Sequence, residues 1–185
     1  MVTTAIQKHW TYTDYLYLDD EQRYEIIEGE LIVTPAPSFR HQRIVTRLIQ
    51  LLSNYILEKG IGEVVVAPVD VVLCEDMVVQ PDIIFISNKN KENIRESGVF
   101  GAPDLVVEII SPSSLYKDIQ VKKRVYEKFG IREYWIVFPD EKTVEIFSLK
   151  QGRYELVSSS QKSGKIKSIE LSLEIDVRNI FRCIE

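Results

Sequence analysis

Apolar side chains recur along the chain with two different periods, and the change of period separates helices from strands. Between residues 38 and 59 the apolar positions lie three or four residues apart, which predicts a long amphipathic helix. Ser38 is a candidate N-cap, and Gly60 follows the expected last turn. Residues 115–129 return to helical spacing and end at Gly130, which predicts a second helix.

Alternating or continuous runs of β-branched residues predict strands elsewhere. The expected strands are residues 63–73, 77–86, 104–110, 133–140, 143–149 and 153–160. A charged loop is expected at 87–102, and the tail is expected to close with a strand and a one-turn helix. Near the N-terminus, Thr11 to Asp14 predicts a helix start and Glu28-Gly29 predicts a hairpin turn. This order predicts an α/β fold with a mixed central sheet, in a single domain spanning residues 1–185.

Composition and charge narrow the function only slightly. The net charge of −5 argues against a strongly basic nucleic-acid-binding domain, but nine of the 23 Lys and Arg residues fall between Lys89 and Arg132. Cys74 and Cys183 are far apart and form no zinc motif, so we expect two free thiols. No apolar run approaches the ~20 residues of a membrane span, and the N-terminus lacks a signal-peptide pattern. A cytoplasmic protein without membrane contact is therefore expected.

Two acidic residues interrupt strongly apolar strands. Asp82 begins the run DIIFI, and Glu108 lies within PDLVVEIISPSS. A lone buried carboxylate is costly unless it is paired, protonated or bound to a metal. If the two strands are neighbours, the carboxylates converge at one end of the sheet, where Mg²⁺, or alternatively Mn²⁺, would be the natural occupant. The alternative is that Asp82 only starts a strand and Glu108 faces outward.

Several longer segments resemble a known family. QPDIIF followed by VVEII resembles the active-site motif of the PD-(D/E)XK nuclease superfamily. RYEIIEGELI, TPAPSFRHQRI, PDLVVEIISPSS and DIQVKKRVYEKFGIREYWIVFPD extend the resemblance, within that superfamily, to the Uma2 family over nearly the whole chain. The resemblance implies a restriction-endonuclease-like mixed sheet flanked by helices, with an N-terminal helix and β-hairpin. It also implies a metal-dependent endonuclease that hydrolyses phosphodiester bonds in DNA.

The resemblance further implies which residues act. Asp82, Glu108 and the backbone carbonyl of Ile109 would bind the metal. The superfamily places a lysine two residues after the glutamate, where this chain has Ile110. The family moves that lysine to the next helix in a D-x-x-x-K-x-x-x-Y-x-x-x-G pattern, matched here by Asp118, Lys122, Tyr126 and Gly130. Lys122 is therefore the expected catalytic lysine, with Lys123 as the main alternative.

Two residues outside these motifs complete the expected site. His41 occupies a position where the family also has a histidine, and it would act as a proton relay or phosphate contact. Glu25 is preferred over Glu30 as an additional acid beside the metal. Nucleases that cut both strands commonly pair two sites, so a homodimer acting on DNA is expected. The alternative function is a non-catalytic module with a nuclease fold that binds nucleic acid or a protein partner.

Overall fold

The computed structural model describes residues 8–20, 22–111 and 117–182. Cys183 and the first two residues of the expected helix at 115–129 lie outside these ranges. The helical elements are α1 (Tyr12–Tyr15), α2 (Phe39–Lys59), α3 (Lys123–Phe129) and α4 (Val177–Phe181), with a 3₁₀ segment η1 (Asn88–Asn93) and a π-helical turn η2 (Lys117–Lys122). No helix in this part of the chain is long and apolar enough to span a bilayer.

The strands form two mixed sheets and one small hairpin. The first sheet has the order β2-β1-β5-β4-β8-β7, from β1 (Tyr24–Ile27), β2 (Glu30–Val33), β4 (Val71–Cys74), β5 (Met77–Val79), β7 (Ile94–Arg95) and β8 (Gly98–Phe100). The second has the order β12-β11-β10-β9-β6-β3, from β3 (Gly62–Val66), β6 (Ile83–Ser87), β9 (Leu105–Ile109), β10 (Glu133–Phe138), β11 (Thr143–Lys150) and β12 (Arg153–Gln161). β13 (Lys165–Ser168) and β14 (Leu173–Asp176) form the hairpin.

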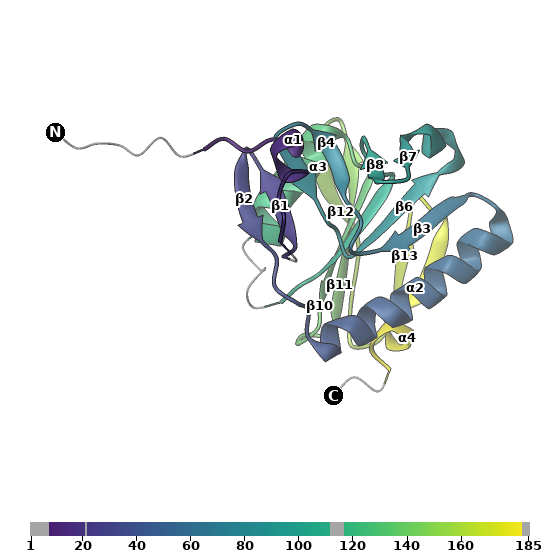
Figure 1. Cartoon of the computed structure of the whole chain (residues 1–185). Helices are drawn as coiled ribbons and strands as arrows, with labels where there is room; N and C mark the ends of the chain where they lie inside the picture. The colour runs from purple at the N-terminus through teal and green to yellow at the C-terminus, as the bar shows by residue number, and fades with distance from the viewer. Residues whose placement is uncertain (1–7, 21, 112–116, 183–185) are drawn as a thin grey trace.

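Helix α2 covers one face of the second sheet (Figure 1). Its buried side chains are Ile44, Val45, Leu48, Leu52 and Ile56. They pack on β6, β9, β10 and β11. The hydroxyl of Ser38 accepts a hydrogen bond from the His41 backbone N–H, and Gly60 ends the helix at φ 60°. The expected helix at 38–59 thus forms because one face is apolar at helical spacing and both ends carry suitable caps.

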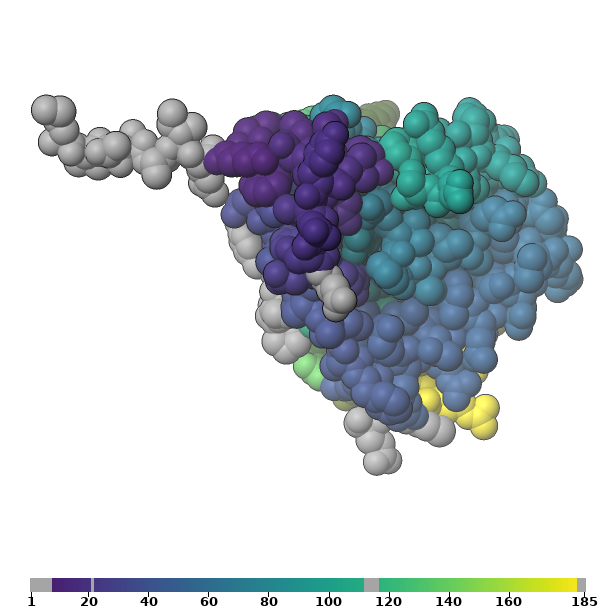
Figure 2. Space-filling view, in the orientation of Figure 1, coloured from purple at the N-terminus to yellow at the C-terminus, as the bar shows by residue number. Residues whose placement is uncertain are grey.

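The opposite face of the second sheet packs against α3 and against strands of the first sheet. On the exterior, α2 and the residues that follow it form much of the face shown in Figure 2, with the N-terminal segment beside them. The expected α/β class with a mixed central sheet is confirmed. The first sheet, β2-β1-β5-β4-β8-β7, is an addition to that expectation.

Two expected strands are wrong as continuous elements. Residues 63–73 divide into β3 and β4, and residues 77–86 divide into β5 and β6. Each pair has one strand in each sheet. Pro68 and Pro81 lie at the two breaks, where proline cannot donate a ladder hydrogen bond. Between residues 63 and 86 the chain therefore crosses from one sheet to the other twice, and Asp82 lies at the second of these two crossings.

The expected strand and one-turn helix at residues 171–181 are confirmed as β14 and α4. β13, which precedes them, was not expected, because it has a single buried apolar side chain, Ile166, and gives almost no periodic signal. Two other expectations need correction. The expected loop at 87–102 contains η1, β7 and β8, and β8 pairs in parallel with β4. In the expected helix at 115–129, the part from Lys117 to Lys122 is a π-helical turn, and α3 begins at Lys123.

Candidate active site

Asp82 lies just before β6, and its carboxylate reaches the end of the neighbouring strand β9. β6 and β9 are antiparallel neighbours, with Ile83 opposite Val107. The Asp82 Oδ2 atom accepts a hydrogen bond from the Ile109 backbone N–H at 2.7 Å. It also lies 3.1 Å from His41 Nε2. Its other oxygen, Oδ1, has no hydrogen bond or ion pair within the described residues, so it remains available for a ligand.

Glu108 is buried near the end of β9, with 3 % of its surface exposed. Its Oε1 accepts hydrogen bonds from the Lys122 ammonium at 2.8 Å and the Tyr126 hydroxyl at 2.6 Å. Burial, together with the negative charges of Asp118, Asp82 and Glu25, raises the pKa of Glu108 to about 8 against the opposing effect of Lys122. The Glu108 carboxyl group therefore holds a proton more readily than an ordinary glutamate does.

Lys122 lies at the centre of the acidic groups. Its Nζ atom is 2.8 Å from Glu25 Oε1, 2.8 Å from Glu108 Oε1 and 3.6 Å from Asp118 Oδ1. Burial alone would lower the pKa of Lys122, but the three carboxylates raise it well above its ordinary value. The ammonium therefore stays protonated. Lys123, the alternative candidate, turns away and places its Nζ 3.6 Å from the centroid of the Phe147 ring.

Glu25 enters the site from β1 in the other sheet and is 1 % exposed. It binds Lys122 through Oε1 and Lys117 through Oε2, the latter at 2.6 Å. Burial raises its pKa, but Lys122 and Lys117 outweigh that effect and lower the pKa to about 2. Glu25 is thus a charged partner of the lysines. Glu30 is exposed and does not line the same pocket.

His41 lies in the first turn of α2, where the Ser38 cap holds its backbone N–H. Its ring nitrogens face Asp82 and the Gln42 side-chain oxygen, the second at 3.2 Å. Burial lowers the pKa of His41, but the hydrogen bond and charge of Asp82 more than offset this, so the net shift is upward. A protonated ring donating to both oxygens satisfies this geometry.

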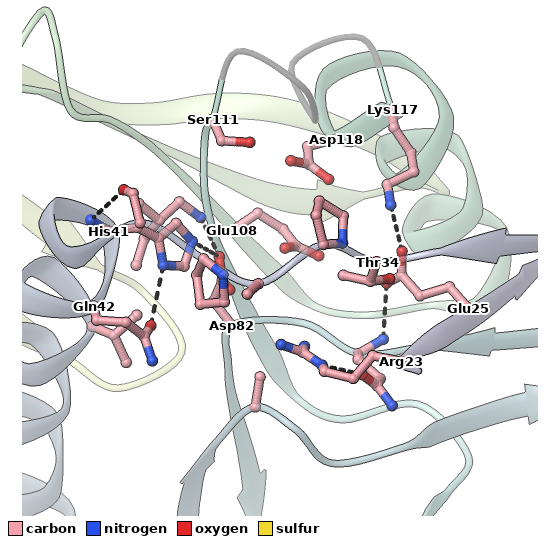
Figure 3. A pocket seen from close by; sticks show the side chains of 18 of the residues that line it. Arg23, Glu25, Thr34, His41, Gln42, Asp82, Glu108, Ser111, Lys117 and Asp118 are labelled. Atoms are coloured by element: carbon pink, nitrogen blue, oxygen red, sulfur yellow. Dashed lines mark hydrogen bonds and ion pairs between the residues drawn. The ribbon is translucent and has the colours of Figure 1, made fainter. Parts of the chain in front are cut away.

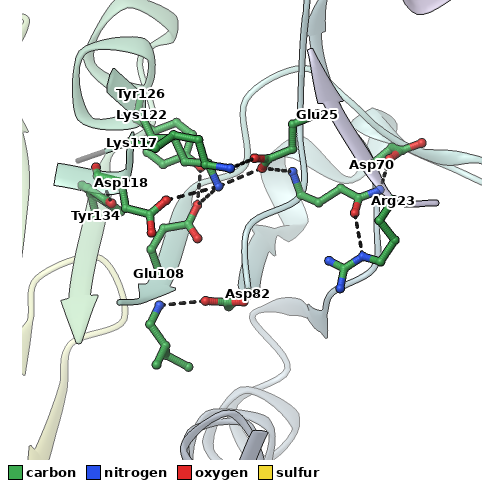
Figure 4. Close-up of polar contacts among 12 residues, drawn as sticks. Arg23, Glu25, Asp70, Asp82, Glu108, Lys117, Asp118, Lys122, Tyr126 and Tyr134 are labelled. Carbon is green, nitrogen blue, oxygen red and sulfur yellow. Dashed lines mark hydrogen bonds and ion pairs between the residues drawn. The ribbon is translucent and has the colours of Figure 1, made fainter. Parts of the chain in front are cut away.

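These residues line one pocket of about 460 Å³ between the two sheets (Figure 3). His41 and Asp82 lie at one side, Glu25 and Lys117 at the other, and Glu108 between them. Figure 4 shows the hydrogen bonds and ion pairs that join Lys122 to the acidic side chains. All residues expected in the site, including Ile109, lie on this pocket; their catalytic and metal-binding roles stay predictions.

Sequence reasoning missed Arg23, Gln80 and the pairing of Lys117 with Glu25. Arg23 and Gln80 both line the pocket, and the Arg23 Nε donates to Gln80 Oε1 at 3.2 Å. The Gln80 backbone N–H donates to Glu25 Oε1 at 3.0 Å. The available signal was position alone: Gln80 directly precedes Pro81-Asp82, and Arg23 directly precedes the strand that contains Glu25.

The family of this protein follows from a match over most of its sequence. Residues 11–178 match the Uma2 family, which is described as "Putative restriction endonuclease". The chain belongs to the Uma2 family. A similar fold occurs in the crystal structure of a protein from Anabaena variabilis, titled a putative nuclease belonging to DUF820. The two are 20 % identical with a TM-score of 0.78, over 95 % of this chain and 99 % of that one. Among curated protein sequences, none matches this chain.

A nuclease of the restriction-endonuclease-like type implies a divalent metal, and the donors in this Uma2 pocket suit one. Carboxylate and carbonyl oxygens are the ligands preferred by Mg²⁺, which keeps several waters and needs only one or two carboxylates. Within residues 8–20, 22–111 and 117–182, no group of three or more His, Cys, Asp or Glu side chains forms a ready-made metal cage. Asp82, Glu108 and the Ile109 carbonyl are the residues that would hold the ion.

Proposed function

We propose that this Uma2 protein is a Mg²⁺- or Mn²⁺-dependent endonuclease that hydrolyses phosphodiester bonds in DNA. The observation that carries the proposal is the meeting of Asp82 and Glu108 from adjacent strands beside Lys122. Each carboxylate has one oxygen without a partner in the described part of the chain. Two such oxygens on one pocket are suitable ligands for a hard cation. We also propose that it acts in the cytoplasm as a homodimer, in which each copy cuts one strand.

In the proposed reaction, some side chains of the pocket would bind the metal ion and others would stabilise negative charge. A bound divalent cation would supply charge at the phosphate and lower the pKa of an attacking water. Asp82 and Glu108 would hold the cation, and the Ile109 N–H fixes the orientation of the Asp82 carboxylate by donating to its Oδ2 atom. Lys122 stays protonated, so it serves as a hydrogen-bond donor to developing negative charge or to the water, and not as a general base. His41 orients Asp82 and can carry a proton at the pocket edge.

Cleavage of supercoiled plasmid tests this proposal directly. Wild-type protein is expected to nick or linearise the plasmid with Mg²⁺ or Mn²⁺ and to be inactive in EDTA. Asp82→Asn keeps the size of the side chain but removes one charged ligand, so both cleavage and the rise of Tm caused by the metal should be lost. The matched control is Asp176→Asn, which alters an aspartate outside the pocket.

The alternative, a non-catalytic nuclease-fold module, predicts a different result. The ion pair between Lys122 and Glu108 favours it, because the ammonium already neutralises part of the acidic charge. A module of this kind would bind DNA without cutting it and would show no change of Tm with Mg²⁺ or Mn²⁺. This pair of results across a wide range of protein concentration would overturn the proposed enzyme.

A further inference from the structure

Arg23 differs from the other cationic side chains of the pocket. Lys117 and Lys122 contact carboxylates, and His41 contacts Asp82. Within the described residues, the Arg23 side chain donates instead to the neutral amide of Gln80. Its guanidinium points into the pocket, with the terminal nitrogens beyond the contact to Gln80 (Figure 3). A cation in this setting has donors left for a ligand.

The partner of Arg23 is itself held in one orientation. Gln80 is 8 % exposed, and its Nε2 donates to Asp70 Oδ1 at 2.7 Å. Turning the amide over would place its NH₂ group against the Arg23 Nε–H and its oxygen against the Asp70 carboxylate. Both new contacts are unfavourable, so Asp70 keeps Gln80 Oε1 directed at Arg23. The Tyr15 hydroxyl donates to the same Asp70 oxygen at 3.4 Å and adds a further contact.

The two sheets make this arrangement possible. β1 and β5 pair antiparallel, with Ile26 opposite Val78. Arg23 precedes β1 and Gln80 follows β5, so the antiparallel register brings these two ends together. The guanidinium is thereby held through Nε, and its two terminal NH₂ groups keep their donors. A fork of donors held in place is suited to the oxygens of a phosphate.

We propose that Arg23 binds a phosphate of the substrate backbone next to the cleaved bond, with Gln80 as its positioning residue. This assignment rests on the proposed nuclease function. Asp82 and Glu108 are acidic residues of the pocket, and carboxylates repel a phosphodiester. Arg23 supplies attraction on the side of the pocket opposite Asp118 (Figure 4). It contacts the backbone and no base edge, so it adds affinity without sequence preference.

The test is the salt dependence of binding to a fluorescein-labelled DNA duplex in EDTA, followed by the KM for cleavage in Mg²⁺. Arg23→Gln is expected to weaken binding about tenfold to a hundredfold, the loss typical of a charge-assisted hydrogen bond. It should also reduce the slope of log K against log salt by about 0.9, the value for one phosphate contact. The loss should be equal for duplexes of unrelated sequence.

Arg153→Gln is the matched control, because it removes the same charge from an exposed residue of β12 outside the pocket. It should change affinity less than about twofold. Arg23→Lys is a second variant that keeps the charge but loses the planar fork; we expect a slope close to wild type and a raised KM.

The outcomes separate the two proposals. If Arg23→Gln binds and cleaves like Arg153→Gln, or if Arg23→Lys has the wild-type KM, the phosphate assignment is wrong while the nuclease stands. Wild-type protein that neither binds the duplex nor cleaves DNA would overturn both.

Discussion

Strands β9 and β10 run side by side, and each buries one glutamate, at opposite ends of their ladder. Glu133 of β10 lies opposite Leu105, and Glu108 of β9 lies opposite Ile136. Glu133 is 1 % exposed, and both of its oxygens are engaged. The donors are Trp135 Nε1, Ser168 Oγ and the backbone N–H groups of Ile169 and Glu170, at 2.6 to 3.0 Å. These hydrogen bonds to Glu133 therefore hold the end of β13 and the turn after it against the central sheet.

Glu108 is almost as buried but is surrounded by charged groups instead of neutral donors. One oxygen binds Lys122 and Tyr126, and the other has no partner within the described residues. Three further acids raise its pKa, and it borders the pocket, which Glu133 does not. A buried acid whose oxygens are all satisfied by neutral donors stabilises the fold. One that keeps an open oxygen beside other acids is instead arranged for a ligand.

The largest expected difference between these two acids is in cleavage. Glu108→Gln removes a proposed metal ligand, so we expect plasmid cleavage to fall by at least about a thousandfold. Glu133→Gln should cleave at nearly the wild-type rate per folded molecule. Equal activity in the two variants would remove the distinction drawn between them.

Stability should show the reverse order. In Glu133→Gln the new NH₂ group faces donors wherever it is placed, so the free energy of unfolding should fall by about 2 to 4 kcal/mol. In Glu108→Gln the amide oxygen can still accept from Lys122 and Tyr126, and the negative charge of the pocket decreases. Urea unfolding in EDTA measures both effects. A Glu108→Gln protein that is less stable than Glu133→Gln would contradict this order.

A smaller effect on cleavage is expected from Lys122→Ala, which separates charge stabilisation from metal binding. Removal of the ammonium should lower cleavage by roughly a hundredfold to a thousandfold. The Tm should still rise with Mn²⁺, because Asp82 and Glu108 remain and the competing ammonium is gone. Lys123→Ala, the adjacent control, loses its contact with Phe147 and should cleave nearly as the wild type does. If Lys123→Ala is instead the inactive variant, Lys122 has been assigned the wrong role.

Local patterns explain why the fold class and the principal acids could be predicted from the sequence. The spacing of Ile44, Leu48, Leu52 and Ile56 predicts α2, because residues four apart share one helix face. Asp82 and Glu108 interrupt apolar runs, which makes each conspicuous by itself. To predict that Asp82 and Glu108 lie close together, it was enough to assume that their two strands pair. Glu133 shows the limit of this reasoning, since it too is an acid at the edge of an apolar run.

The features of the fold and the site that the sequence did not predict depend on contacts between distant segments. The crossings at Pro68 and Pro81 were hidden by the continuous apolar runs on both sides of them. Arg23 and Gln80 meet only because β1 pairs with β5, and neither residue belongs to a periodic pattern. The choice between Lys122 and Lys123 depends on the rotation of a π-helical turn, which spacing along the chain does not give.

A further expected effect concerns Glu25, another buried acid, whose charge is stabilised by Lys117 and Lys122. Its pKa is lowered to about 2, so its ionised form adds stability above its ordinary value of 4.5, and that contribution is lost as the pH falls toward 2. Glu25→Gln should therefore reduce the free energy of unfolding by roughly 3 kcal/mol at pH 7. The difference from wild type should shrink between pH 4.5 and 2, because the protonated acid and the amide are both neutral. Glu133→Gln is the comparison, since its loss arises from hydrogen bonds to neutral donors. If the Glu25→Gln difference stayed constant over this pH range in urea unfolding, Lys117 and Lys122 would not be the source of the stabilisation.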